Sequence, residues 1–349
     1  MKPTPRRIVA CMLAAGLGIL VICLVVAPSG GNVAHAAGST HGIAATGLLD
    51  TPNCDQPPTN VDHATFTDAQ LDLYGLPHRL SGESLEHWQW VVRAAKYRVC
   101  TGTATNIRHA PPARQKVTSA ATYNEQSSVW AGNIAYGYGY TTAIQQWKQP
   151  CLTLLLHDGV ALMWTGLGGD GNDGGGNLIQ SGTVAQEYQD GIGRWVAQYY
   201  AFIEDYPWNP TVINKFGISW NDTMYASDYQ VYSGGNPVEA HMYINDVTTG
   251  QYAHSINTNA FSNGSTAEWI VERASTTYGW GNNNLAKFGS VTFTHCEAVR
   301  NGSYYSPINL PHNYSTMVYN NHDLVSVGPL YADGSDSGAH FTMTWLHSS

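Results

Sequence analysis

The stretch Thr266-Ala267-Glu268-Trp269-Ile270-Val271-Glu272 decides the fold class. In it, β-branched and aromatic residues alternate with polar ones, and a Ser, Thr and Gly segment follows, so the pattern predicts a β-strand that ends in a turn. Successive side chains of a strand point to opposite faces, which places Ala267, Trp269 and Val271 on one face and Glu268, Ile270 and Glu272 on the other. The carboxylate of Glu272 is therefore either an ordinary solvent-facing group or a catalytic group on a rigid floor.

The composition agrees with a protein built from strands and turns. Only 12% of the residues are charged, while Gly numbers 36, Tyr 21 and Trp 11. Short apolar stretches recur between Gly, Asn and Asp turns, so we expect an all-β fold, an antiparallel sandwich of two packed, curved sheets. These stretches are 129–140, 152–156, 161–166, 195–202, 242–244 and 291–294, and the alternating tail 339–345 predicts a final strand.

The first 36 residues have the pattern of a secretory signal peptide. A cationic start precedes an apolar run from Ile8 to Ala27, and Ala34-His35-Ala36 is a small-residue cleavage site. The alternative is a retained membrane anchor, because the run approaches the length that spans a bilayer. We expect cleavage and a secreted, extracellular protein with no membrane attachment afterwards.

Residues 37–120 are predicted to be a propeptide or an accessory region that is partly helical. Thr67 to Gln70 forms a capping box, and the segment from Glu83 to Val99 has apolar residues at helical spacing. This apolar stripe should be buried against the main domain, residues 121–349. As a propeptide, the region would cover the active-site cleft until acid releases it; as an accessory domain, it would stay attached.

Charge and cysteines limit the partners. Residues 121–349 carry six Lys and Arg against eighteen Asp and Glu, so a nucleic-acid partner is not expected. Four cysteines follow the signal segment, and we expect the pairs Cys54 with Cys100 and Cys151 with Cys296. No Cys-x-x-Cys or His-x-x-x-His spacing occurs, so no metal or other cofactor is predicted, and we expect a monomer.

Five short motifs follow one another in a recognisable order. They are Trp164-Thr165-Gly166, Ile179-Gln180-Ser181-Gly182, Glu204-Asp205-Tyr206-Pro207, Asp246 to Gln251, and Thr266 to Glu272. In order and spacing they resemble the glutamic endopeptidases (eqolisins), from about Trp130 to the C-terminus. The resemblance implies two packed antiparallel sheets with an active site on the concave face.

The resemblance also implies a catalytic scheme that acts on polypeptides without a metal or a covalent intermediate. Glu272 would remove a proton from water and later return it to the leaving amine, and Gln180 would stabilise the oxyanion. Trp130, Trp164 and Glu204 match residues at the substrate cleft of the family. Without the resemblance, Gln180 would be an ordinary polar strand residue and the tryptophans would be core residues.

The chain departs from the family at two places, and two other functions stay open. The acid that usually follows Trp-x-Gly is absent at Gly168 unless Asp170 replaces it, and Val184 or Ala185 stands where an acid or amide is common. Aromatic-rich sandwiches also include glycoside hydrolases and non-catalytic carbohydrate-binding or adhesion modules. The carboxylates of Glu268 and Glu272 argue against sugar hydrolysis, because four strand residues separate their backbones by about 13 Å, whereas retaining enzymes need about 5 to 5.5 Å between carboxyl groups.

Overall fold

The computed structural model describes residues 54–80, 82–100, 125–169, 177–206, 210–259, 261–274, 284–333 and 338–348. Their strands belong to one 18-stranded sheet that folds back on itself. Every pairing between named strands is antiparallel except β1 with β11 and β2 with β15. The predicted all-β class is confirmed, and the two sheets of the predicted sandwich are two layers of one continuous sheet.

The order of pairing defines the two layers. The first layer runs β8 (Thr211–Val212), β7 (Trp195–Asp205), β6 (Ile179–Gln189), β5 (Gly159–Leu167), β12 (Thr266–Glu272), β3 (Trp130–Tyr136) and β15 (His312–Tyr319). The second continues with β16 (His322–Val327), β18 (Ala339–Trp345), β13 (Ser290–Arg300), β4 (Tyr140–Lys148), β9 (Thr223–Ser233), β10 (Asn236–Asp246), β11 (Gln251–Asn257) and β1 (Tyr97–Arg98). The short strands β2 (Glu125–Ser127), β14 (Ser303–Tyr305) and β17 (Tyr331–Ala332) extend β15, β13 and β18.

Three apolar clusters lie on successive faces of this sandwich. The largest fills the space between the layers and includes Trp269 of β12 and Trp147 of β4. A second cluster, with Ile270 and Trp164, lies on the outer face of the first layer. A third, with Tyr243 of β10, lies on the outer face of the second layer. Because alternate residues of one strand face opposite ways, the two outer faces are on opposite sides of the molecule.

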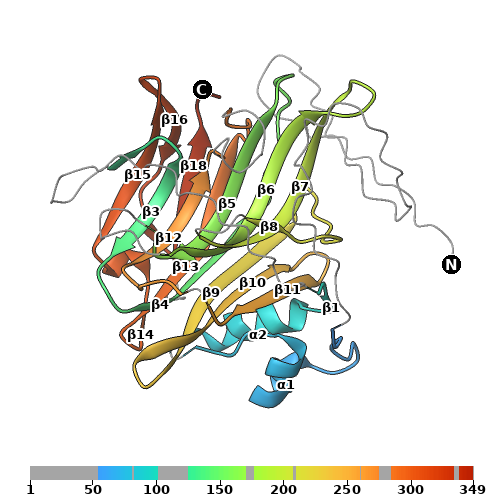
Figure 1. Ribbon diagram of the computed structural model, residues 1–349, viewed down its shortest axis with the longest axis vertical. Helices are drawn as coiled ribbons and strands as arrows, with labels where there is room; N and C mark the ends of the chain where they lie inside the picture. The colour runs from blue at the N-terminus through green and yellow to red at the C-terminus, as the bar shows by residue number, and fades with distance from the viewer. Residues whose placement is uncertain are drawn as a thin grey trace.

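The helical region covers the outer face of the second layer. It consists of η1 (His63–Thr65), α1 (Asp68–Tyr74) and α2 (Leu85–Ala94); a further single turn, η4 (Pro307–Asn309), precedes β15. The apolar stripe of α2, with Val91 and Val92, packs against tyrosines of β9, β10 and β11. Figure 1 shows α2 at the bottom of the view, below β10 and β11. The expected burial of this stripe is confirmed. The helical residues that the structure describes lie on the face opposite the site described below, so they do not occupy the position over the cleft that the propeptide alternative would need.

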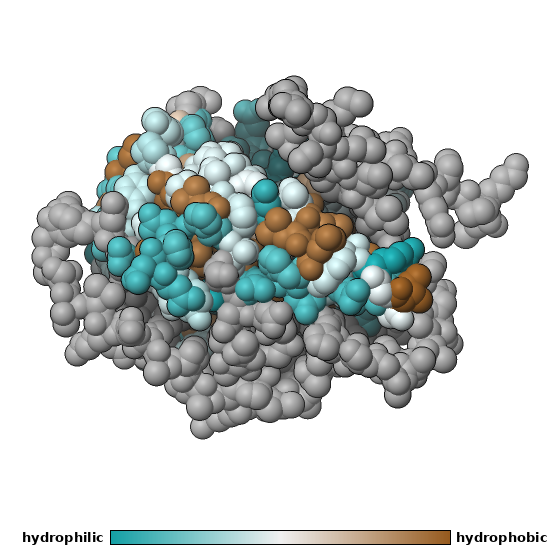
Figure 2. All heavy atoms as spheres, turned by 90° about the horizontal axis from the view of Figure 1, so that it is seen from above, coloured by the Kyte–Doolittle hydropathy of each residue, from teal (hydrophilic) through white to brown (hydrophobic). Residues whose placement is uncertain are grey.

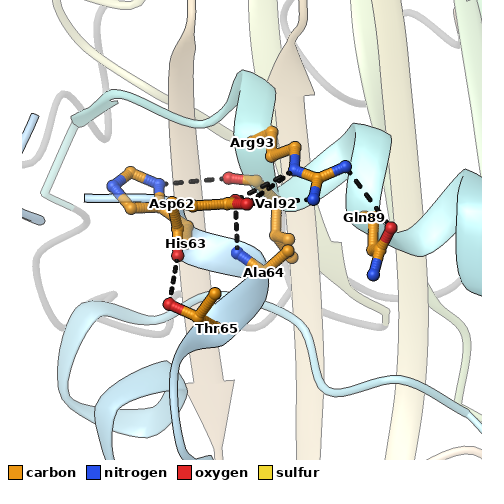
Figure 3. Close-up of polar contacts among 7 residues, drawn as sticks. All are labelled: Asp62, His63, Ala64, Thr65, Gln89, Val92 and Arg93. Atoms are coloured by element: carbon orange, nitrogen blue, oxygen red, sulfur yellow. Dashed lines mark hydrogen bonds and ion pairs between the residues drawn. The ribbon is translucent and has the colours of Figure 1, made fainter. Parts of the chain in front are cut away.

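Polar contacts fix η1 to α2 (Figure 3). The guanidinium of Arg93 donates from Nε to Asp62 Oδ1 at 2.9 Å and also contacts Gln89 Oε1. The His63 ring lies 3.1 Å from the carbonyl oxygen of Val92. A disulfide between Cys54 and Cys100 closes the region, as predicted. The helical region is therefore internally tied as well as packed on the sandwich.

Several sequence expectations need correction. The helix predicted for Glu83 to Val99 ends at Ala94, because the next residues form β1 and pair with β11. The apolar stretch 152–156 forms no strand. Cys296 is a buried free thiol, so the predicted Cys151 to Cys296 bond is wrong. The signal segment 1–36 lies outside the described residues, and so do residues 37–53 and 101–120 of the predicted propeptide or accessory region.

The described surface has mixed polarity. On the face seen in Figure 2, hydrophobic residues form small separate groups among hydrophilic ones. Scattered exposed apolar side chains are normal for a folded protein and need no partner to explain them. Within the described ranges, no helix is long and apolar enough to cross a membrane.

Buried carboxyl groups predict a fold that is most stable in acid. Burial raises the pKa of Glu83 to about 7, that of Asp205 to about 6 and that of Asp222 to about 7. Such groups hold a proton in the fold at a pH where the unfolded chain has lost it, so their stabilisation is present in acid and is lost as pH rises through about 6 to 7. Burial lowers the pKa of His87 to about 4 and also lowers that of His254, which acts in the opposite direction.

Replacing Glu83 with glutamine isolates this effect. The shift from 4.5 to about 7 corresponds to about 3 kcal/mol of stability, which the wild type loses as the pH rises from below 4.5 to above about 7. We expect Glu83→Gln to lose about 3 kcal/mol less over the same interval, measured by chemical denaturation. The matched control is Glu86→Gln, which replaces an exposed carboxylate three residues further on, in the first turn of α2, and should behave as wild type. Equal pH dependence in the wild type and Glu83→Gln would contradict the prediction.

Candidate active site

Strand β12 forms the centre of the site. All seven of its residues are buried, and it pairs with β3 on one side and β5 on the other. The predicted alternation is confirmed, because Trp269 lies in the core between the layers while Ile270 lies on the outer face of the first layer. Glu272 shares the face of Ile270 and is only 7% exposed, so it is not an ordinary solvent-facing carboxylate.

The register of β12, β5 and β6 places Gln180 and Glu272 on the same face. Glu272 pairs with Leu162 of β5, and Gln180 of β6 pairs with Gly166 of β5. Side chains of paired residues point the same way, so both groups project from the outer face of the first layer. Between them on this face runs a row of residues that pair across β12, β5 and β6, and Trp164 is its central member, because it pairs with Ile270 and with Gly182.

Two tryptophans surround the carboxylate of Glu272. The indole Nε1 of Trp164 donates a hydrogen bond to Glu272 Oε2 at 2.9 Å. Trp130 pairs with Glu272 across β3 and β12, and its ring meets that of Trp164 edge to face with centroids 5.1 Å apart. Both rings are buried. A hydrogen bond from a neutral donor, made within an apolar surround, fixes the orientation of the carboxylate.

The amide of Gln180 is oriented by Glu204. These two residues pair across β6 and β7, and Gln180 Nε2 donates a short hydrogen bond to Glu204 Oε2. Both side chains are buried. A primary amide has two N–H donors, so this contact uses one and leaves the second for another acceptor.

Glycines keep the floor beside Trp164 clear. A Cβ at Gly182 would lie 2.6 Å from the Cβ of Trp164 and 2.1 Å from the carbonyl oxygen of Met163. A Cβ at Gly166 would lie 3.1 Å from the Cβ of Gln180. Side chains at either position would displace the strand or the groups beside it. The glycines therefore allow the closely set arrangement of Trp164 and Gln180.

The two places where the sequence departs from the family pattern differ in how far the structure describes them. Asp170, the suggested replacement for the missing acid, lies outside the described residues. Val184 lies on the site face, where it pairs with Leu162, whose other partner is Glu272. Ala185 faces the core between the layers. An apolar side chain thus occupies the face position where an acid or amide is common.

Trp164→Phe tests the hydrogen bond to Glu272. Phenylalanine keeps an aromatic ring in the row but removes the indole N–H. Hydrogen bonds to charged groups contribute about 1.5 to 3 kcal/mol, so we expect kcat/KM for a peptide substrate to fall roughly 10- to 100-fold. Trp195→Phe, at the far end of β7, is the matched control and should retain activity. A Trp164→Phe protein with wild-type kcat/KM would show that this contact does not position a working group.

Comparison with known proteins identifies the chain's family. The family model described as the Peptidase A4 family matches residues 128–331. The chain belongs to this family. Aspergillopepsin-2 of Aspergillus niger is 30% identical over 237 residues, which cover 66% of this chain and 73% of that protein. The fold resembles that of scytalido-glutamic peptidase in a crystal structure with a transition state analog inhibitor, with a TM-score of 0.50, 21% identity, and coverage of 63% of this chain and 98% of that one.

Membership of the Peptidase A4 family makes the chain a glutamic-type endopeptidase. It decides against the two other functions that the sequence left open, the glycoside hydrolase and the non-catalytic binding module. The second carboxylate of β12, that of Glu268, accepts a hydrogen bond from Thr266 Oγ1 at 2.8 Å within its own strand.

Proposed function

We propose that this Peptidase A4 protein is an exported acid endopeptidase in which Glu272 activates water and Gln180 stabilises the oxyanion. One observation carries the proposal: the two side chains project from the same face of β12 and β6, on either side of the row that contains Trp164. Each is buried and each has a side-chain hydrogen bond that orients it.

The reaction proceeds in two proton transfers. The carboxylate of Glu272 takes a proton from a water molecule as the oxygen attacks the carbonyl carbon of the peptide bond. The negative charge that develops on the carbonyl oxygen is stabilised by the second N–H of Gln180. The protonated Glu272 then donates to the amide nitrogen as the C–N bond breaks, which releases the amine and restores the carboxylate.

The surrounding residues have supporting roles in this scheme. Glu204 accepts one N–H of Gln180 Nε2 and would leave the other N–H for the substrate, so Glu204 is a positioning residue. Trp130 and Trp164 form the apolar wall of the substrate cleft beside Glu272. Polypeptides are the substrates, and export agrees with the Cys54 to Cys100 disulfide, since such bonds persist in oxidising compartments. We propose that the protein acts as a monomer without a nucleic-acid partner or a membrane attachment.

The domain organisation completes the proposal. The β-rich part from residue 121 onward contains the whole described site. The helical region lies on the opposite outer face, tied by a disulfide and by β1, so we propose that it is a lasting accessory region and does not block the cleft.

A digestion experiment tests the function. The purified full chain is incubated with an unfolded protein and with a soluble polysaccharide, at acid and at neutral pH. We expect internal peptide cleavage in acid, seen as new termini by mass spectrometry, and no change in the polysaccharide. Reagents that modify serine or cysteine, and chelators used well below the unfolding temperature, should leave the rate unchanged. Loss of activity with a serine- or cysteine-directed reagent would overturn the proposed chemistry.

A further inference from the structure

A cluster of metal-binding side chains joins the helical region to the sandwich. His87 of α2, His295 of β13 and Glu297 of β13 each offer one ligand atom, and these atoms all lie within 4.8 Å of one another. The rings of His87 and His295 are stacked with centroids 4.0 Å apart. The cluster lies on the outer face of the second layer, opposite the peptidase site, because Glu297 pairs with Ile144, which packs against the helical region.

The fold directs both β13 side chains toward α2. The register of β13 shifts between Phe293 and Cys296 against β18, and between Thr294 and Glu297 against β4. His295 sits in this bulge with φ of 47°, and its backbone N–H donates to Asp333 Oδ2 at 2.8 Å. Bulges bend a strand and re-aim a side chain, and they are common next to functional sites. Here the bulge brings the imidazole of His295 against that of His87.

The cluster contains polar groups that are costly to bury. Glu297 is fully buried, and its Oε2 accepts a hydrogen bond from the Tyr304 hydroxyl. His87 is 6% exposed, and neither ring nitrogen makes a hydrogen bond of normal geometry within the described chain, although the Gln146 side chain lies near the ring. Buried polar groups are normally paired, and a cation would pair with both the imidazole and the carboxylate.

We propose that His87, His295 and Glu297 bind one Zn²⁺ ion. Two imidazole nitrogens and one carboxylate oxygen form a donor set that suits zinc, and three protein ligands leave one position of a tetrahedral ion for water. The Tyr304 hydroxyl donates a hydrogen bond to Glu297 and would orient this carboxylate toward the ion. Because the ligands come from α2 and β13, the ion would hold the helical region on the sandwich. It would not take part in peptide hydrolysis on the opposite face.

Zinc titration of the metal-free full chain tests the site. The protein is stripped with a chelator, dialysed, and titrated with zinc chloride near neutral pH by calorimetry. We expect one ion per chain for the wild type, and a loss of affinity of about 10- to 100-fold or more in His87→Gln and in His295→Asn. Glutamine suits a helix, and asparagine tolerates the positive φ of position 295, so both variants keep the local backbone. His322→Ala removes an exposed histidine and should bind as the wild type.

Two further measurements separate this site from zinc bound at surface histidines. Saturating zinc should raise the melting temperature of the wild type and slow amide exchange in α2, and it should do neither in the two variants. Peptidase activity on the opposite face reports that each variant is folded. A wild type that binds no zinc, or variants that bind it as tightly as the wild type, would overturn the proposal. So would zinc binding that leaves α2 exchange unchanged.

Discussion

Replacing Glu272 with glutamine should lower kcat/KM for a peptide substrate by on the order of 10³-fold, within the range that general acid and base groups contribute. Glutamine keeps the shape of the side chain and can still accept the hydrogen bond from Trp164 Nε1, but it cannot take a proton from water. The measurement is steady-state cleavage of a quenched fluorescent peptide in acid. Substrate binding should change much less than kcat, because the lost function acts on the reaction step.

Glu268→Gln is the matched control for this variant. Glu268 lies on the same strand and the same face, and glutamine can still accept the hydrogen bond from Thr266. We expect the control to retain activity. If both variants lost activity equally, the two carboxylates of β12 would be acting together, and the pairing of Glu272 with Gln180 would be wrong.

Gln180→Ala should lower kcat by about 10²- to 10³-fold, the loss seen when an oxyanion donor is removed from other enzymes. The substitution also leaves the Glu204 carboxylate without its donor from β6. Gln186→Ala, another buried glutamine on the same face of the same strand, is the control and should keep kcat near the wild-type value. Equal losses in the two variants would mean that any truncation of β6 has the same effect, and would remove the special role of Gln180.

Gln180→Glu adds a second check on the same residue. A carboxyl group can donate a hydrogen bond only while it is protonated. This variant should therefore keep part of its activity in acid and lose it as the new group ionises. A pH profile identical to that of the wild type would show that position 180 does not donate to the oxyanion.

The positions of the strands, and the faces on which their side chains lie, could largely be predicted from the sequence. Strand β12 has the predicted bounds, and so does β18 at the C-terminus. Thr67 is the N-cap of α1 and forms the predicted capping box with Gln70, and Gly75 follows the last helical residue with φ of 65°. These features depend on local patterns, namely alternation, capping and turn residues, which one sequence contains in full.

Features that depend on residues far apart in the sequence could not be predicted in this way. The helical periodicity continues past Ala94, but pairing with β11 draws Tyr97 into a strand. The contact of Gln180 with Glu204 follows from the register of β6 and β7, which no local pattern fixes. The His87 and His295 cluster joins residues far apart in the chain, so it has none of the short spacings by which metal sites are recognised.

Strand β1 also protects the edge of the second layer from pairing with other polypeptides. Tyr97 and Arg98 pair with Gln251 and Tyr252 and so occupy the free edge of β11. An uncovered edge offers a row of backbone donors and acceptors to any extended chain, including a substrate polypeptide or a partly unfolded copy. Cutting away the helical region would remove this cover. The truncated enzyme would then bind extended segments at the edge of β11, away from the face where Glu272 and Gln180 would cleave them.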